Sequence, residues 1–168
     1  MRLTAEIYYP GIHPVAVFTM LTDRAFQERK CAATGSLAYE VDLELFEDGG
    51  ASITTHRTLP TDQVPEFVRR FVGGSVRVVE RHDWQGLSDD GTRQGTLIVE
   101  ITGAPVHMTC DIRLIADDDG TVHEVDGDLK SSVPLIGGKI EKAVEPAIRA
   151  AMRVEERTGR AWLSGDPD

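Results

Sequence analysis

The segment from about residue 136 to 163 constrains the fold most, because it reads as one long amphipathic helix. Its apolar residues recur at every third or fourth position: Ile140, Val144, Ile148 and Ala151. A helix that continues to about Leu163 would be roughly 40 Å long at 1.5 Å per residue. Pro146 should kink it, since proline removes one helical donor and crowds the preceding turn. The opposite face is charged and predicted to be solvated: Glu141, Lys142, Glu145, Arg149, Arg153, Glu156 and Arg160.

Three small residues of this helix, Ala143, Ala147 and Ala151, accompany the apolar stripe. Small side chains that face a curved sheet leave volume open. The alternative is close packing of sheet on helix, because protein interiors are normally filled.

Most of the preceding chain alternates apolar and polar residues with the period of two that is typical of strands. Residues 2–9 form the first predicted strand. Residues 13–34 break the pattern and predict two short helices, with Pro14 in the first turn and a break near Leu21 and Thr22. Residues 35–59 predict a hairpin that turns at 48–50.

Residues 60–73 carry two prolines and then apolar residues at helical spacing, which predicts an inserted short helix. Four further strands are expected after it, separated by turns at 86–91, 103–105 and 117–120. The sequence therefore predicts an α+β chain with seven antiparallel strands, two short helices after the first strand and one long C-terminal helix.

The order of these elements, with "HDW" at 82–84 and "VPLIGGKIE" at 133–141, resembles the START/polyketide-cyclase/birch-pollen-allergen (SRPBCC) superfamily of helix-grip proteins. In more detail it looks like an actinobacterial branch of undefined function. The resemblance covers nearly the whole chain, so it implies one domain over residues 1–168. It also implies a curved seven-stranded sheet wrapped around the long helix, with a cavity between them.

Composition excludes several kinds of partner. A net charge of −10 argues against nucleic acid and anionic membrane surfaces, which are bound mainly through lysine and arginine. No apolar run is long enough to span a bilayer, and the N-terminus lacks the apolar core of a signal peptide. Two distant cysteines form no disulfide framework, so we expect a cytoplasmic protein. We expect it to be either a monomer or a homodimer.

Ligand-lining residues are predicted from the strand faces that would point at the helix. The set is Tyr39, Val41, Ile53, Arg57, His82, Trp84, Val99, Met108, Cys110, Ile140, Val144 and Ile148. Leu37, Leu97, Ile101 and Ile112 share these faces. The implied ligand is a hydrophobic small molecule, lipid-like or polyketide-like.

Polar residues on the strands offer a few candidates for chemistry. Glu80, His82 and Trp84 alternate on one face, and a histidine beside a carboxylate can act as a general base; the alternative is that all three point outward. Arg57 would either bind a ligand carboxylate or pair with an acid in the core. His56 and His123 are further polar candidates.

Other kinds of site find less support. Cys110 has apolar neighbours on its face, where a thiol stays inert, whereas Cys31 is expected near a helix end and exposed. The five histidines show no zinc spacing, and the acidic run at 117–119 fits a turn better than a calcium loop. We expect no metal and no cofactor.

The stretch "PLIGGKIEKAVEP" at 134–146 superficially resembles a phosphate loop. A Walker loop needs glycine where this chain has Val133, and serine or threonine where it has Ile140. We expect instead that Gly137 and Gly138 let the chain turn into the helix, and that Lys139 is solvated and binds no anion. A valine at position 137 would be strained if that residue has a positive φ.

Three functions remain open at this stage. Non-enzymatic binding of the hydrophobic ligand is favoured because the resemblance implies a pocket and no catalytic constellation is evident. The second is a cyclase or aromatase in which Arg57, His82 or Glu80 assists proton transfer. The third is an interaction module with a filled core, which docks a partner through Phe67 and Phe71 of the insert.

Overall fold

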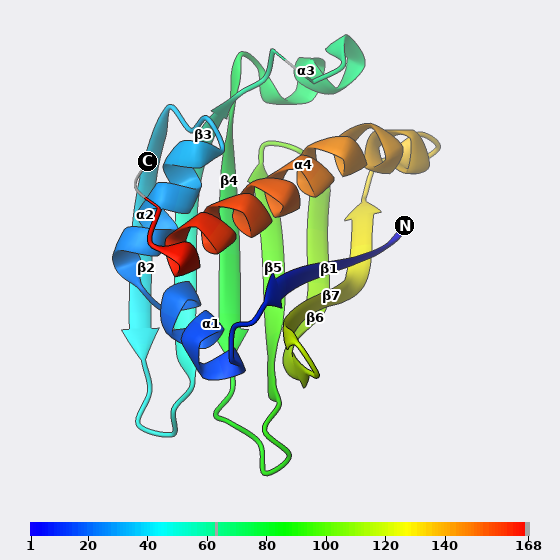
Figure 1. Cartoon of the computed structure of the whole chain (residues 1–168). Coiled ribbons are helices and arrows are strands. Elements are labelled where there is room, and N and C mark those ends of the chain that lie inside the picture. Colours follow the sequence, from blue (N-terminus) through cyan, green and yellow to red (C-terminus); the bar gives the residue numbers. More distant parts are fainter. Residues whose placement is uncertain (63, 167–168) are drawn as a thin grey trace.

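A single antiparallel sheet crossed by one long helix makes up the architecture of the computed structural model, which describes residues 1–62 and 64–166 (Figure 1). The strands are β1 (Arg2–Pro10), β2 (Ala38–Leu45), β3 (Ala51–Pro60), β4 (Ser75–Trp84), β5 (Arg93–Thr102), β6 (Val106–Asp117) and β7 (Gly120–Ser131). The helices are α1 (Pro14–Leu21), α2 (Arg24–Ala33), α3 (Glu66–Val72) and α4 (Gly137–Ser164). The predicted fold class, with seven strands and two short helices after the first strand, is confirmed.

Strand order in the sheet is β1-β7-β6-β5-β4-β3-β2. Every strand from β2 to β7 pairs with its neighbours in the chain, whereas β1 pairs with β7 at the far edge. The helices α1 and α2 therefore carry the chain from one edge of the sheet to the other. The helix α4 then returns across one face, which we call the inner face (Figure 1).

Local sequence explains where the two short helices begin. The His13 side chain accepts a hydrogen bond from the Val15 backbone N–H, and proline occupies the first turn of α1. The Asp23 carboxylate accepts from the backbone N–H groups of Ala25 and Phe26 at the start of α2. Asp23 is thus the cap that separates the two helices at the predicted break.

Pairing register decides which side chains share the inner face, because residues directly opposite in an antiparallel pair lie on the same side of the sheet. One such row crosses the sheet through Thr55, Glu80, Val99 and Met108. The buried apolar residues of these rows form the core together with α1, α2 and Ile140 of α4.

The two ends of α4 are fastened to the sheet. At its beginning, Glu141 accepts hydrogen bonds from the Met1 amino group (3.1 Å) and from the Ser131 backbone (3.0 Å). Farther along, Arg149 and Arg160 donate to backbone carbonyls of the edge strand β1. These arginines bind backbone carbonyls of an edge strand, which would otherwise be free to accept hydrogen bonds from another strand.

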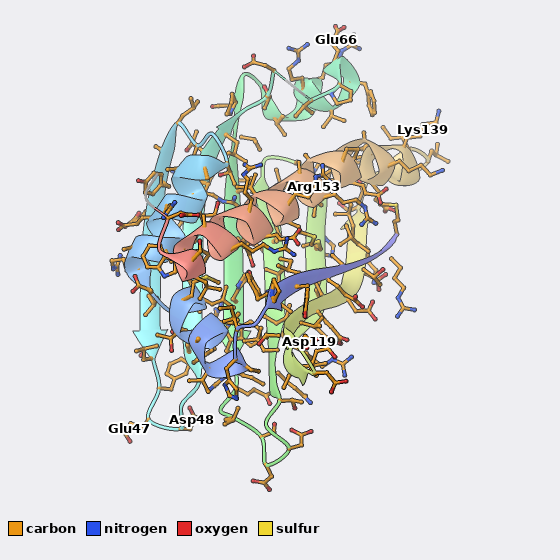
Figure 2. All side chains as sticks on the ribbon, in the orientation of Figure 1. Glu47, Asp48, Glu66, Asp119, Lys139 and Arg153 are labelled. Atoms are coloured by element: carbon orange, nitrogen blue, oxygen red, sulfur yellow. The ribbon has the colours of Figure 1, made fainter. Side chains whose placement is uncertain are left out.

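The turn before α4 differs from the prediction. Gly137 and Gly138 are the first two residues of the helix, and neither has a positive φ. The left-handed residue is Leu135, with φ 67°, and its side chain is fully exposed. The condition for strain at position 137 is therefore not met. Lys139 is exposed at the outer end of α4 (Figure 2).

The positive φ of Leu135 leads to a stability prediction. Replacing it with glycine should raise the free energy of unfolding by up to about 1 kcal/mol, since a left-handed L-residue costs roughly 1–2 kcal/mol and glycine offsets part of that gain through unfolded-state entropy. Urea denaturation measures the change. Leu135→Ala is the control and should shift stability by less than about 0.5 kcal/mol. A Leu135→Gly protein less stable than Leu135→Ala would contradict the assignment.

Candidate functional site

Four charged side chains meet in the interior between α2, the sheet and α4. The Lys30 ammonium donates to Glu80 at 2.8 Å and to Glu155 at 3.2 Å. The Arg57 guanidinium donates to Glu80 at 2.5 Å and to the Thr34 hydroxyl at 3.4 Å. Lys30 is only 2% exposed and Arg57 4%. We call these four side chains, Lys30, Arg57, Glu80 and Glu155, the ionic cluster.

The ionic cluster balances two positive charges with two negative ones. Burial alone would raise the pKa of the Glu80 carboxyl, but Lys30 and Arg57 hold that pKa well below its ordinary value. Burial would also raise the pKa of the Glu155 carboxyl. Lys30, and to a smaller extent His123, instead lower that pKa below its ordinary value. Burial would lower the pKa of Lys30, yet Glu155 and Glu80 raise it overall. All three groups are therefore held in their charged forms.

Two histidines extend the cluster across the inner face. His82 Nε2 lies 3.3 Å from Glu80 Oε1, and His123 Nδ1 lies 3.6 Å from Glu155 Oε1, neither with the alignment of a hydrogen bond. Both imidazoles are buried. Each histidine thus faces a carboxylate that a cation already holds.

The indole ring of Trp84 lies beside the imidazole of His123. Its ring centroid lies 5.5 Å from that of His123, although β4 and β7 are separated by two strands. Gly95, directly opposite Trp84, makes this possible, because a Cβ there would lie 3.1 Å from the Trp84 ring. The absence of a side chain on β5 leaves room for the indole.

Several buried polar atoms in this region have no hydrogen-bond partner among the described residues. They are Tyr9 Oη, Gln27 Oε1, Thr55 Oγ1, Arg57 Nε, His82 Nε2, Trp84 Nε1, both His123 nitrogens and Glu155 Oε1. Buried polar groups are nearly always satisfied by protein, water or ligand. This part of the interior is therefore suited to hold a polar group of some kind.

Apolar surface adjoins the ionic cluster along α4. The helix is described throughout, and between Ile140 and Glu155 none of its residues is fully buried. Val144, Ile148 and Met152 contact the core but remain half-buried, as do Val76 and Ile101 on the sheet. Apolar side chains in the middle of α4 and on the neighbouring part of the sheet thus remain partly exposed.

Most of the predicted ligand-lining residues lie on the inner face and are buried: Val41, Ile53, Arg57, His82, Trp84, Val99, Met108 and Cys110. Ile140, on α4, is also buried. Val144 and Ile148 are half-buried. Tyr39 shares the inner face with Arg57, but it lies on the edge strand β2 and is 44% exposed. The register brings these residues together, and whether they contact a ligand stays a prediction.

Glu80, His82 and Trp84 point inward, so the outward alternative for these three residues is wrong. Of the two alternatives for Arg57, pairing with an acid in the core is the one observed, because Glu80 already binds its guanidinium. His56 lies on the other face, half-exposed, 3.6 Å from Asp42.

Three expectations about individual side chains are wrong. Cys31 is fully buried, because it lies on the inner side of α2, and burial raises the pKa of its thiol. Ala147 is exposed and so does not face the sheet. Leu37 precedes β2 and is 66% exposed. Cys110 is buried as expected, with burial the largest cause of a thiol pKa of about 11.

Lys30 and Glu155 were missed by sequence reasoning, although they hold the cluster together. Glu155 lies three residues after Met152 and seven after Ile148, so it continues the apolar stripe of α4. Lys30 follows Phe26 at helical spacing in the same way. A charged residue at a position in the apolar stripe of a helix was the signal that could have identified both Lys30 and Glu155.

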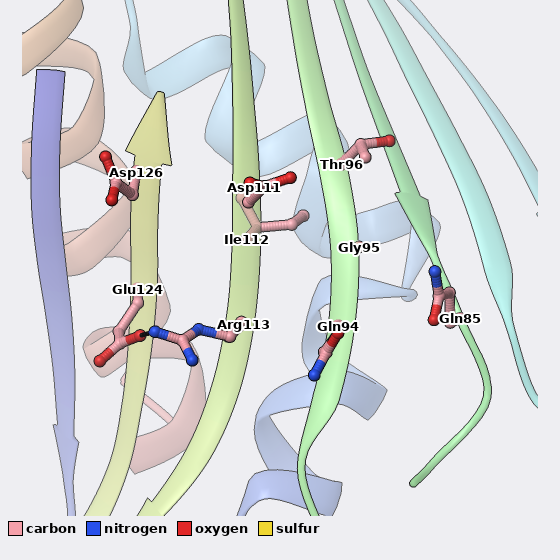
Figure 3. Close-up of a pocket in the computed structure, with 9 residues that line it drawn as sticks. All are labelled: Gln85, Gln94, Gly95, Thr96, Asp111, Ile112, Arg113, Glu124 and Asp126. Atoms are coloured by element: carbon pink, nitrogen blue, oxygen red, sulfur yellow. Dashed lines mark ion pairs between the residues drawn. The ribbon is translucent and has the colours of Figure 1, made fainter. Parts of the chain in front are cut away.

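Two hollows lie outside this interior. One, of about 400 Å³, lies over β5, β6 and β7 on the face opposite α4, where Arg113 pairs with Glu124 at 2.6 Å (Figure 3). The other, of about 320 Å³, lies by the β5–β6 turn and reaches Ile101 and Val106. Among the described residues no group of three or more His, Cys, Asp or Glu is placed to hold a metal. No described helix is long and apolar enough to cross a membrane.

Comparison with known proteins identifies the family of this chain and other proteins with the same fold. The model of a family described as "Protein of unknown function (DUF2505)" matches residues 6–163. The Mycobacterium tuberculosis protein named "Uncharacterized protein Rv0481c" is 21% identical over 122 residues, which cover 71% of this chain and 70% of that protein.

Solved structures show the same fold at low identity. Protein Ms6760 of Mycobacterium smegmatis has a TM-score of 0.61 and 13% identity, covering 98% of this chain and 91% of its own. A START superfamily protein of the same organism has a TM-score of 0.52 and 12% identity, covering 93% of each chain. The predicted helix-grip fold is confirmed, and the matching family is one of undefined function.

The ionic cluster yields a stability prediction. Lys30→Met leaves Glu155 without its cation and should lower the free energy of unfolding by about 3–5 kcal/mol, the usual effect of removing one partner from a buried pair. Adding Glu155→Leu should restore part of that loss, because Glu80 still pairs with Arg57. Chemical denaturation measures both variants.

Lys130→Met is the matched control for this prediction, since Lys130 is exposed and lies 3.8 Å from Asp128. It should change stability by less than about 1 kcal/mol. If Lys30→Met cost no more than Lys130→Met, the cluster would not stabilise the fold.

Proposed function

We propose that this chain, which belongs to the DUF2505 family and has a START-like helix-grip fold, binds a hydrophobic small molecule between α4 and the inner face of its sheet. The ligand is lipid-like or polyketide-like. The protein acts as a single domain over residues 1–168, in the cytoplasm, as a monomer or homodimer. Two buried, unpaired cysteines are in keeping with a reducing compartment.

One observation carries this proposal: the middle of α4 is not buried against the sheet. In a closed core, apolar side chains such as Val144, Ile148 and Met152 would lose nearly all of their exposure. Here they remain half-buried although the helix is fastened at both ends. Apolar surface left partly exposed in this way is what a hydrophobic ligand would cover.

The walls of the site would come from the inner-face rows nearest that stretch of helix. Val78, Val99 and Met108 supply apolar surface from β4, β5 and β6. Val144 and Ile148 lie on the helix side. Tyr39, exposed on β2, would lie at the edge of the site rather than in its centre.

We place binding ahead of proton-transfer catalysis. Glu80 and His82 lie together in the interior, as a cyclase or aromatase would need. However, Lys30 and Arg57 hold the pKa of the Glu80 carboxyl well below its ordinary value. A general base is most effective when its pKa is near the working pH, so this carboxylate is a weak one.

The interaction-module alternative depends on the insert between β3 and β4. Phe67 of α3 is 42% exposed, as that alternative requires. The side chain of Phe71 lies outside the described part of the structure. A single exposed phenylalanine is ordinary for a soluble protein, so binding in the interior remains the preferred function.

Val144→Trp tests the proposal. A tryptophan here would occupy the space assigned to the ligand, so we expect a co-purifying ligand to disappear from native mass spectra of protein purified from its own host. Thermal shifts with a broad lipid panel should be lost in parallel. If the proposal is right, stability should change little, because the proposed ligand space can hold the new side chain.

Ala150→Trp, on the exposed side of the same helix, is the control and should retain both signals. If the wild-type chain is recovered without ligand and no lipid shifts its melting temperature, the proposal loses its support. A loss of about 1–3 kcal/mol in Val144→Trp alone would indicate an already filled core.

A further inference from the structure

Five buried polar atoms that have no hydrogen-bond partner among the described residues belong to Glu155 and to three aromatic side chains near it, at one end of the proposed site. Glu155 Oε1 lies 3.6 Å from His123 Nδ1, and the His123 ring lies beside Trp84. Tyr9 lies against the next turn of α4, since a Cβ at Gly159 would be 3.0 Å from its hydroxyl oxygen. The atoms are Tyr9 Oη, Trp84 Nε1, both His123 nitrogens and Glu155 Oε1. We call this group the polar end.

The polar end continues the apolar surface of α4. Ile148, Met152 and Glu155 follow one another at spacings of four and three residues, so they share one side of the helix. A molecule lying along Val144 and Ile148 would therefore reach the polar end at one of its tips. The order along the helix is apolar first and polar last.

Hydrogen-bonding capacity at the polar end is mixed. The indole Nε1 only donates, and the carboxylate oxygen of Glu155 only accepts. A neutral imidazole offers one donor and one acceptor, and a phenol offers both. Burial and the charge of Glu155 raise the pKa of Tyr9, so its hydroxyl keeps its proton. The matching occupant both donates and accepts.

Charge at the polar end argues against an ionic ligand. Lys30 and Arg57 are already neutralised by Glu80 and Glu155. A ligand carboxylate could only accept and would be placed beside Glu155, while both cations of the ionic cluster are already paired with carboxylates. An ammonium group could only donate, which would leave the Trp84 donor unmatched.

We propose that the polar end binds the hydroxyl group of an uncharged alcohol or phenol whose remainder is apolar. This assignment rests on the proposed function, because the apolar part of the ligand occupies the space beside α4. The ligand hydroxyl oxygen accepts a hydrogen bond from Trp84 Nε1–H, and the hydroxyl O–H donates a hydrogen bond to Glu155 Oε1. The interior thus discriminates among ligands by the hydrogen-bonding type of the head group rather than by its charge.

Four probes with one carbon skeleton test this assignment on the full chain at neutral pH: naphthalene, 2-naphthol, 2-methoxynaphthalene and 2-naphthoate. Dissociation constants come from NMR titration of the backbone amides. We expect 2-naphthol to bind at least about five-fold more tightly than naphthalene, the effect of one net hydrogen bond. The methyl ether, which accepts only, should fall between them, and 2-naphthoate should bind more weakly than naphthalene.

Two variants remove single groups from the polar end. Trp84→Phe keeps an aromatic ring without the donor, and Tyr9→Phe removes only a hydroxyl. Each should reduce the preference for 2-naphthol by about three-fold or more while leaving naphthalene within two-fold of wild type. Trp162→Phe is the matched control, because Trp162 packs on Phe26 and contributes no atom to the polar end, and it should change neither constant.

The outcomes separate the two proposals. If naphthalene binds and 2-naphthol binds no better, the polar end is satisfied by water, and the assignment is wrong while the proposed function stands. Tighter binding of 2-naphthoate would also overturn the assignment. If none of the four probes binds, the proposed function fails and the assignment fails with it.

Discussion

The rest of the structure depends on the two buried ion pairs that Lys30 makes. This one ammonium group joins α2 to Glu80 of the sheet and to Glu155 of α4. Removing four charges from water is costly, and only complete mutual pairing offsets that cost. The elements α2, β4 and α4 are therefore fixed relative to one another at a single point, and displacement of any of them would leave a buried charge unpaired.

The fixed point explains why α4 leaves surface uncovered elsewhere. Its C-terminal half is held by the ionic cluster and by the close approach of Gly159 to Tyr9 and Met20. Its first turns are held by Glu141 at the start of β1. Between these attachments Arg149 bonds to the Thr4 carbonyl of β1, but Val144, Ile148 and Met152 remain half-buried. A binding surface thus follows from how the helix is anchored rather than from small side chains along it.

Sequence periodicity predicted the parts of the fold that depend on local pattern. Alternation in the strands and the stripe of Ile140, Val144 and Ile148 follows from which side chains must avoid water. Leu135 could not be predicted, because its positive φ is imposed by the path between β7 and α4, and the neighbouring glycines drew attention away from it. Tyr39 was placed on the correct face, but an edge strand does not bury its side chains fully.

The candidate site was predicted less completely than the fold. Arg57, His82 and Trp84 were identified because strand parity assigns them to a face. Lys30 and Glu155 were not, because charged residues on amphipathic helices are ordinarily solvated and their partners are distant in sequence. Pairing between a helix and a strand 50 residues away is set by tertiary structure, and a single sequence contains no record of it.

Diffraction from a crystal pressurised with xenon tests the central claim most directly, because xenon enters apolar cavities without needing a particular head group. The account predicts a xenon peak between Val144 or Ile148 of α4 and Val99 of the sheet, with Lys30 still bound to Glu80 and Glu155. Side chains closed over this space, with no xenon between helix and sheet, would contradict it.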